Sequence, residues 1–223
     1  MALRLHAVKP LLIALILLAG CAPASFFSTP NDVVREKALL YWNNGDTTTG
    51  EISVALETIF SANVNYQPSI EFTPTGKIGK QVIHFADIRG YRIGSTYYAL
   101  KNLDISVNGT YRTLFVKQLT PDSSKIHLYE LHESGRGNAT GESLYSYYLS
   151  FKNSGPLETI NSKSVKIIPN FDQKMSEIVS DCPKLADKIR RKQDGYYLPF
   201  ISFNPKKQPE VLLRIINEYN SCY

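Results

Sequence analysis

Three cysteines have the most distinctive positions of any reactive residues in this 223-residue chain. Cys21 directly follows an apolar stretch near the start, whereas Cys182 and Cys222 lie near the end and far apart in the sequence. Thiol redox enzymes commonly use a Cys-x-x-Cys motif, and the chain contains none. The spacing therefore disfavours redox catalysis and leaves anchoring or cross-linking as the chemistry of these thiols.

The residues before Cys21 have the layout of a secretion signal. Arg4 and Lys9 form a basic region, and an uncharged apolar run follows from Leu11 to Ala19. An uncleaved membrane anchor is the alternative, but spanning a bilayer takes roughly 20 predominantly apolar residues. Here the apolar run reaches only from residue 10 to residue 21. We therefore interpret residues 1–20 as a cleaved signal peptide.

The end of that segment, Leu18-Ala19-Gly20-Cys21, resembles the lipobox of bacterial lipoproteins. The resemblance implies that the Cys21 thiol is lipidated and that Cys21 becomes the mature N-terminus. Lipoproteins of this type carry two or three acyl chains such as palmitate, and one chain alone anchors only marginally at about 0.8 kcal/mol per buried CH₂. In lipoproteins of this type, an aspartate directly after the cysteine favours retention in the inner membrane. Here that position is Ala22, so the resemblance implies an outer-membrane location. Cleavage elsewhere in the signal is the alternative.

With Cys21 lipidated, Cys182 and Cys222 form an even pair in an oxidising compartment, the periplasm or the cell surface. This arrangement favours a disulfide between them. A bridge closing a loop of this length stabilises a fold by roughly 4 kcal/mol in the chain-entropy model. Two buried free thiols, or one reactive cysteine, are the alternatives.

Motifs for nucleophilic, metal or phosphate chemistry are missing from the sequence. It has no Gly-x-Ser-x-Gly and no glycine-rich phosphate loop, and residues 135–137 (Gly-Arg-Gly) do not open a helix. Of the histidines outside the signal, His127 and His132 fall on opposite faces of one expected strand, with His84 distant in sequence. We therefore predict no catalytic residue, no metal and no cofactor.

Acidic residues leave one enzymatic alternative open. A glycoside hydrolase needs two carboxylates about 5 to 9.5 Å apart, and a sequence cannot show such a separation. The candidates that we considered are Glu57, Glu71, Asp87 and Glu130.

Tyrosine is the compositional excess that suggests binding, with 14 in the chain. Aromatic surfaces bind glycans, peptides and proteins, but tyrosine is also an ordinary half-buried strand residue. The tyrosines in question are Tyr91, Tyr97, Tyr98, Tyr111, Tyr129, Tyr145, Tyr147, Tyr148, Tyr196 and Tyr197.

The charge of the chain argues against nucleic acid as a partner. Loss of Arg4 and Lys9 with the signal lowers the formal net charge from +5 by two, which leaves a mildly basic protein. The basic groups at residues 190–192 and 206–207 border expected helices, whose dipoles they complement. A patch for anionic lipid is the alternative for these groups.

The sequence from Glu36 to about residue 160 predicts an antiparallel β-rich domain. Short runs of Val, Ile, Tyr, Phe and Thr alternate with Gly, Asn and Pro at turn spacing. The expected strands are Lys37–Trp42, Gly50–Ile59, Gln81–Ile93, Thr96–Asn102, Tyr111–Leu119, Ile126–His132 and Leu144–Phe151.

A C-terminal helical segment follows over residues 161–223. We expect Asn170 to cap its first helix, with Gln173 closing a capping box. A second helix is expected from Pro183 to Arg191, and residues 195–204 form a connector or strand. The last helix begins near Pro209. Its apolar stripe consists of Val211, Leu212, Ile215, Ile216 and Tyr219.

The expected architecture is α+β: a tether over residues 21–35, a predominantly antiparallel β-sheet domain over 36–160, and the helical segment docked on it. These features favour a lipid-anchored envelope lipoprotein that binds an envelope protein or glycan without catalysis. A hydrolase of envelope polymers with paired carboxylates, and a purely structural or assembly factor, are the alternatives.

Replacement of the lipidated thiol tests the location. A Cys21→Ser variant should lose lipid labelling and accumulate as the unprocessed precursor, because serine offers no thiol to the lipid transfer. Metabolic labelling with a radioactive fatty acid and the mobility of the chain on a gel provide the measurement. Continued labelling of the variant would rule out Cys21 as the lipidation site.

Overall fold

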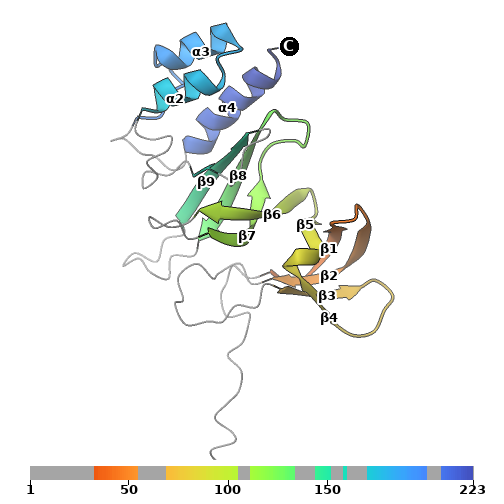
Figure 1. Cartoon of the computed structure of the whole chain (residues 1–223). Helices are drawn as coiled ribbons and strands as arrows, with labels where there is room; N and C mark the ends of the chain where they lie inside the picture. The colour runs from red at the N-terminus through yellow and green to blue at the C-terminus, as the bar shows by residue number, and fades with distance from the viewer. Residues whose placement is uncertain are drawn as a thin grey trace, which may run out of the picture.

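The computed structural model describes residues 33–54, 69–104, 111–133, 144–151, 158–159, 170–199 and 207–222. Within these ranges the chain has the expected α+β class, with strands first and helices at the C-terminal end (Figure 1). The predicted signal, the lipobox-like sequence that ends at Cys21 and most of the predicted tether lie outside the described residues. So do Glu57, Lys206 and the Gly-Arg-Gly sequence at 135–137.

Ten strands of the described part form one antiparallel sheet in the order β10-β9-β8-β7-β6-β5-β1-β2-β3-β4. Strands that follow one another in the chain are neighbours in the sheet, except β4 and β5. Strand β5 instead pairs with β1, and this pairing joins the β1–β4 meander to the rest of the sheet. The strands are β1 Val33–Trp42, β2 Thr47–Val54, β3 Ser69–Pro74, β4 Gln81–His84, β5 Ile88–Ile93, β6 Thr96–Asp104, β7 Tyr111–Gln118, β8 Ile126–Glu133, β9 Leu144–Phe151 and β10 Glu158–Thr159.

The first half of the sheet has its own hydrophobic core. Alternate residues of β1, β2 and β3 point to one face, where Leu40, Ile52 and Phe72 are buried. Tyr91 from β5 and Phe115 from β7 complete this core, their rings meeting edge to face with centroids 4.9 Å apart. The strands of this half lie together at one end of the molecule (Figure 1).

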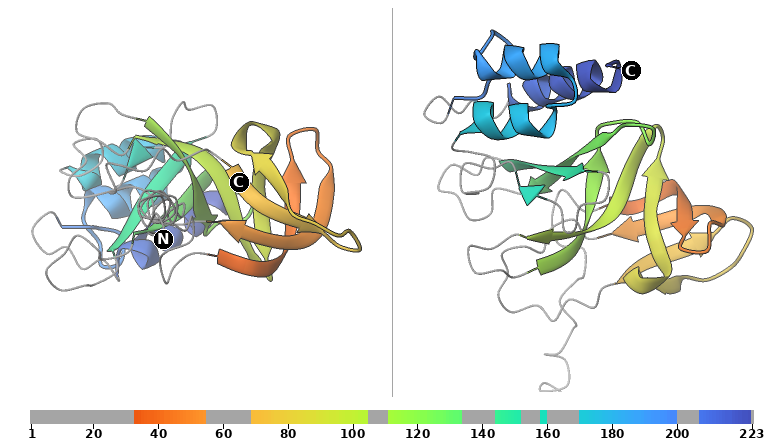
Figure 2. Two further views of the ribbon diagram at one scale, coloured as in Figure 1. Left: turned by 90° about the horizontal axis from the view of Figure 1, so that it is seen from below. Right: turned by 45° about the horizontal axis from the view of Figure 1, so that its top comes forward.

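The second half is buried on both faces. Leu128 and Leu149 of β8 and β9 pack under the helices, whereas Tyr129 and Tyr148 on the opposite face join a cluster with Val116 of β7. Two-sided burial explains why both faces of β8 carry apolar residues in the sequence. Figure 2 shows the helices stacked over the end of the sheet that contains β8 and β9.

The two halves are joined through a short ladder between β7 and β8. Only Lys117 with Glu130 and Gln118 with Tyr129 are paired there, whereas the β6–β7 register covers seven residue pairs and the β8–β9 register eight. An ion pair of 3.7 Å between Lys117 Nζ and Glu130 Oε1 spans the junction. The hydroxyl of Tyr147 donates a hydrogen bond of 3.1 Å to Glu130.

The helices α2 Phe171–Ile178, α3 Pro183–Arg190 and α4 Gln208–Asn220 follow the expected pattern. All five residues of the predicted α4 stripe are buried, which confirms it. The capping box at Asn170 was wrong. Asn170 has a left-handed backbone with φ 73° and makes no side-chain cap hydrogen bond, whereas a capping side chain normally needs an extended backbone to reach the first turn.

Several strand boundaries differ from the expectation. The run predicted as one strand over Gln81–Ile93 is broken by a 3₁₀ turn at Phe85–Asp87, because Phe85 is buried in the core while the chain passes from the edge strand β4 to β5 beside β1. Strand β3 was missed. Residues 33–35, assigned to the tether, belong to β1, where a register shift coincides with the positive φ of 53° at Arg35. Residues 195–199 form no strand.

Gly90 is required where β5 crosses between β1 and β6. It pairs with Tyr41 on one side and Ala99 on the other. A Cβ atom at this position would collide with the backbone oxygen of Tyr98 and would lie 2.7 Å from the hydroxyl oxygen of Tyr97. Any side chain would therefore push neighbouring strand β6 away.

We predict that Gly90→Ala lowers the free energy of unfolding by about 3 kcal/mol, because both the colliding backbone and the tyrosine ring must shift. Gly94→Ala is the control: its φ of 57° is left-handed, but a Cβ there would meet no atom within 4 Å. The control should lose about 1 to 2 kcal/mol, the cost of a left-handed backbone alone. Urea unfolding measures both, and equal losses would contradict the close approach at Gly90.

Candidate binding surface

Two tyrosine rings meet on the face of the sheet opposite the first core. Tyr41 of β1 and Tyr97 of β6 lie across β5, and their ring centroids are 5.2 Å apart at 77°. They meet there because Gly90, the residue of β5 between them, has no side chain, and Tyr97 lies directly over it. Edge-to-face contact is a preferred geometry for aromatic pairs and contributes about 0.5 to 1.5 kcal/mol.

Two arginines of β5 complete this arrangement, which we name the tyrosine–arginine patch (Tyr41, Arg89, Arg92 and Tyr97). The Cζ atoms of Arg89 and Arg92 lie 5.5 and 5.9 Å from the centroid of the Tyr41 ring, within the range of cation–π attraction. Both arginines are exposed. Neither forms an ion pair with a carboxylate of the described residues.

The phenols of Tyr97 and Tyr129 remain neutral at physiological pH. Burial raises the pKa of Tyr97, and the Arg89 guanidinium opposes that rise only in part. The hydroxyl of Tyr97 donates a hydrogen bond of 3.3 Å to the carbonyl of Arg89. Burial, with smaller contributions from Tyr97 and Asp122, raises the pKa of the neighbouring Tyr129 to about 12. The patch thus places the neutral phenol of Tyr97 beside positive guanidinium groups.

Lys101 and His127 extend the same face over β6 and β8. Lys101 Nζ lies 5.4 Å from the centroid of the Tyr129 ring, and burial lowers the pKa of Lys101. Burial and the charge of Lys101 lower the pKa of His127. His127 is therefore neutral at physiological pH.

The structure separates His84 from His127. His84 lies on the edge strand β4 and His127 lies on β8, with six strands of the sheet between them. Among the described residues no group of three or more His, Cys, Asp or Glu could hold a metal ion.

The candidate carboxylates are dispersed over the described part of the chain. Glu71 of β3 pairs with Lys80 at 2.8 Å, Asp87 lies in the 3₁₀ turn, and Glu130 lies at the β7–β8 junction. Glu71 does share an open pocket of about 200 Å³ with Glu51. Glu51 was not among the sequence candidates.

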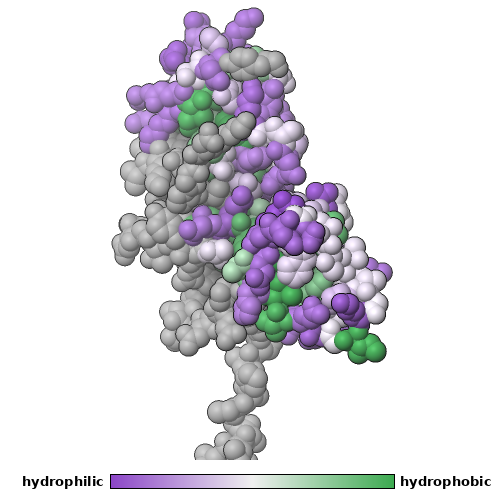
Figure 3. Space-filling view, turned by 45° about the vertical axis from the view of Figure 1, so that its right-hand side comes forward, coloured by the Kyte–Doolittle hydropathy of each residue, from purple (hydrophilic) through white to green (hydrophobic). Residues whose placement is uncertain are grey.

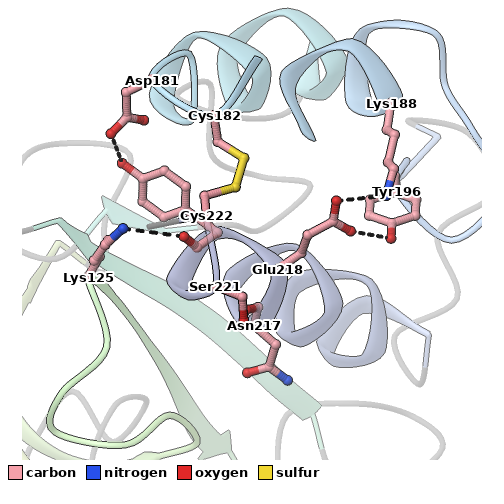
Figure 4. Close-up of a disulfide and its surroundings, with 10 residues drawn as sticks. Lys125, Asp181, Cys182, Lys188, Tyr196, Asn217, Glu218, Ser221 and Cys222 are labelled. Carbon is pink, nitrogen blue, oxygen red and sulfur yellow. Dashed lines mark hydrogen bonds and ion pairs between the residues drawn. A yellow bond between two sulfur atoms is a disulfide. The ribbon is translucent and has the colours of Figure 1, made fainter. Parts of the chain in front are cut away.

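The structure brings Cys182 and Cys222 together in a disulfide, with Cα atoms 6.0 Å apart (Figure 4). The bridge joins the residue before α3 to the end of α4. Neighbouring contacts attach α4 to its surroundings: Tyr219 donates a hydrogen bond of 2.9 Å to Asp181, and the backbone N–H of Lys125 donates one of 2.9 Å to Asn220.

A carboxylate network joins α3, α4 and the segment between them. Glu218 of α4 accepts hydrogen bonds from Lys188 Nζ at 2.7 Å and from the Tyr196 hydroxyl at 2.5 Å (Figure 4). Burial alone raises the pKa of Glu218, but these two hydrogen bonds outweigh it and leave the pKa below its ordinary value.

Of the residues that form the tyrosine–arginine patch, the sequence suggested only Tyr97. Tyr41 and the two arginines were missed, because strand periodicity does not show which strands become neighbours. Gly90 was the available indication, since glycine inside a strand often marks a close approach of another group. The predicted tyrosines Tyr91, Tyr129, Tyr147 and Tyr148 are buried in the cores.

The network at Glu218 predicts a specific acid sensitivity. A lowered pKa in the folded state stabilises the fold above the unfolded value near 4.5, and that contribution is lost as pH falls through the folded pKa. Glu218→Gln should therefore reduce stability at neutral pH and flatten the loss of stability below pH 4.5. Glu177→Gln, at an exposed carboxylate on α2, is the control. Urea unfolding at stepped pH distinguishes them, and parallel curves for wild type and Glu218→Gln would contradict the assignment.

Comparison with known proteins found no protein-family model, no curated protein and no solved structure that matches the chain.

Proposed function

We propose that the chain is a lipid-anchored lipoprotein of the bacterial envelope, attached to the outer membrane through Cys21, and that its sheet binds an envelope protein or glycan without catalysing a reaction. The tyrosine–arginine patch is the observation that carries the binding role. The resemblance of Leu18-Ala19-Gly20-Cys21 to a lipobox supports the location.

The patch has the composition of a recognition surface. Tyrosine and arginine are the side chains that most often dominate binding energy in interfaces. Here they stand on three hydrogen-bonded strands, which hold the rings in place before a partner arrives. Arg89 and Arg92 have no carboxylate partner within the described ranges, so an acidic or hydroxyl-rich group can approach them without first breaking an ion pair.

The rest of the surface favours polar recognition over hydrophobic docking. On the face in Figure 3, hydrophobic areas are small and separated by hydrophilic ones. Large exposed apolar side chains of the described residues, Val34, Ile78, Val82 and Tyr145, come from different strands and turns. In the same part of the chain, no helix is both long and apolar enough to cross a membrane.

Binding accounts for the described geometry better than hydrolysis does. The pocket that holds Glu51 and Glu71 is open, and Glu71 is already engaged by the Lys80 ammonium. A general acid in a glycosidase is instead held in surroundings that keep its proton on. The patch requires no such environment.

Site-specific photo-crosslinking in living cells tests this function. A photoreactive amino acid at Arg92 of the full-length chain should give one discrete adduct, whereas the same group at Lys77, in an exposed turn between β3 and β4, should not. A Tyr97→Ala change added to the first chain should reduce the yield of that adduct by about tenfold, the effect of losing one dominant contact. Protease digestion of the adduct separates a protein partner from a glycan.

The proposal fails if positions 92 and 77 give the same adducts, or if neither gives one. It also fails if Tyr97→Ala leaves the yield unchanged while the variant remains folded by circular dichroism.

A further inference from the structure

A cavity of about 520 Å³ lies in the helical segment, between the loop that follows α3 and the first two turns of α4. Its volume lies within the usual range for small-molecule sites. The helices that carry it stand at the opposite end of the molecule from β1 and β5 (Figure 1), so this cavity and the tyrosine–arginine patch are separate sites. One wall is apolar, formed by Tyr197, Leu198 and Val211.

The loop on one side of the cavity is fixed by the end of α3. The N–H of Lys192 donates to the carbonyl of Ile189, and the N–H of Gln193 donates to that of Lys188, both at 3.0 Å. These two bonds form a Schellman motif, with Lys192 in the left-handed position at φ 55°. The loop therefore presents a defined wall to the cavity.

The guanidinium of Arg214 is held against this loop. Its Nη1 occupies the space where a Cβ of residue 195 would lie, so a side chain there would displace the guanidinium, and Gly195 also has a positive φ of 79°. The Cζ atom of Arg214 lies 5.9 Å from the centroid of the Tyr196 ring. The backbone and the ring together keep this cation beside the cavity.

Four charged side chains around the cavity form no ion pair within the described ranges. Glu210 and Arg214 are four residues apart on α4, a spacing at which such side chains commonly form an ion pair. Arg214 instead turns toward Gly195. Within the described ranges, neither Arg214 nor Lys207 pairs with a carboxylate, and neither Glu210 nor Asp194 pairs with a cation. Lys192, also in the lining, pairs with Asp172 at 3.6 Å.

We propose that this cavity binds a zwitterionic ligand with an apolar body, of the chemical class of a short peptide with free termini. Arg214 and Lys207 receive the carboxylate, with the positive end of the α4 dipole beside them. Glu210 and Asp194 receive the ammonium group. The apolar wall contacts the side chains. The two carboxylates of the cavity would repel a simple anion, whereas the ammonium group of a zwitterion would be attracted to them.

Calorimetric titration of the full-length lipidated chain in detergent micelles tests this assignment with three probes. The dipeptide Leu-Leu should bind saturably. Its N-acetyl derivative and its C-terminal amide, each lacking one charge, should bind about tenfold more weakly, the effect of losing a charge-assisted hydrogen bond.

Variants assign the two ends of the ligand. Arg214→Ala should remove the preference for Leu-Leu over its amide, and Glu210→Gln should remove the preference over the N-acetyl form. Both residues are exposed, so the fold should survive. Lys184→Ala, at an exposed position on α3 outside the lining, should keep both preferences.

Absence of saturable binding by Leu-Leu at millimolar concentration overturns the proposal. Equal binding of Leu-Leu and its N-acetyl derivative also overturns it and identifies a simple anion site. Because the patch on β1, β5 and β6 takes no part in this titration, its result does not depend on the crosslinking at Arg92.

Discussion

Burial of both faces of β8 and β9 is the constraint on which the second half of the molecule depends. A strand that is covered on one side only can place polar residues on the other, but Leu128 and Tyr129 point in opposite directions and are both buried. The helices must therefore dock on one face for the sheet to be stable there. That docking puts α3 and α4 in the positions that create the Glu218 network, the disulfide and the cavity beside Arg214.

The first half is organised differently, because its strands enclose a core without help from helices. Its outer face is consequently free to carry polar and aromatic groups, and the tyrosine–arginine patch lies on that face. The two glycines that matter most, Gly90 and Gly195, have the same physical role in the two halves. Each removes a side chain where a tyrosine ring or a guanidinium has to approach the backbone closely.

The sequence predicted what depends on local pattern. The α4 stripe was recognisable because its apolar spacing follows the helical period. Strand β9 was placed over the correct residues because the run is rich in aromatic side chains. The sequence pattern could not predict which strands pair, because β5 and β1 are separated by about fifty residues of chain. Tyr41 and Arg92 become neighbours only through that pairing. The left-handed backbone at Asn170 was missed for a related reason, because asparagine suits both a cap and a left-handed turn.

The short β7–β8 ladder allows the two halves of the protein to unfold separately. With two residue pairs between the halves, few backbone hydrogen bonds couple their opening. Each half has a hydrophobic core of its own, and the small cluster of Val116, Tyr129 and Tyr148 is a hydrophobic contact across the junction. Such an arrangement separates a chain into cooperative units that exchange their amide protons at different rates. The disulfide between Cys182 and Cys222 restricts the unfolded ensemble of the helical unit alone. Reduction should therefore destabilise the helical end of the molecule, while the half that carries the tyrosine–arginine patch remains folded.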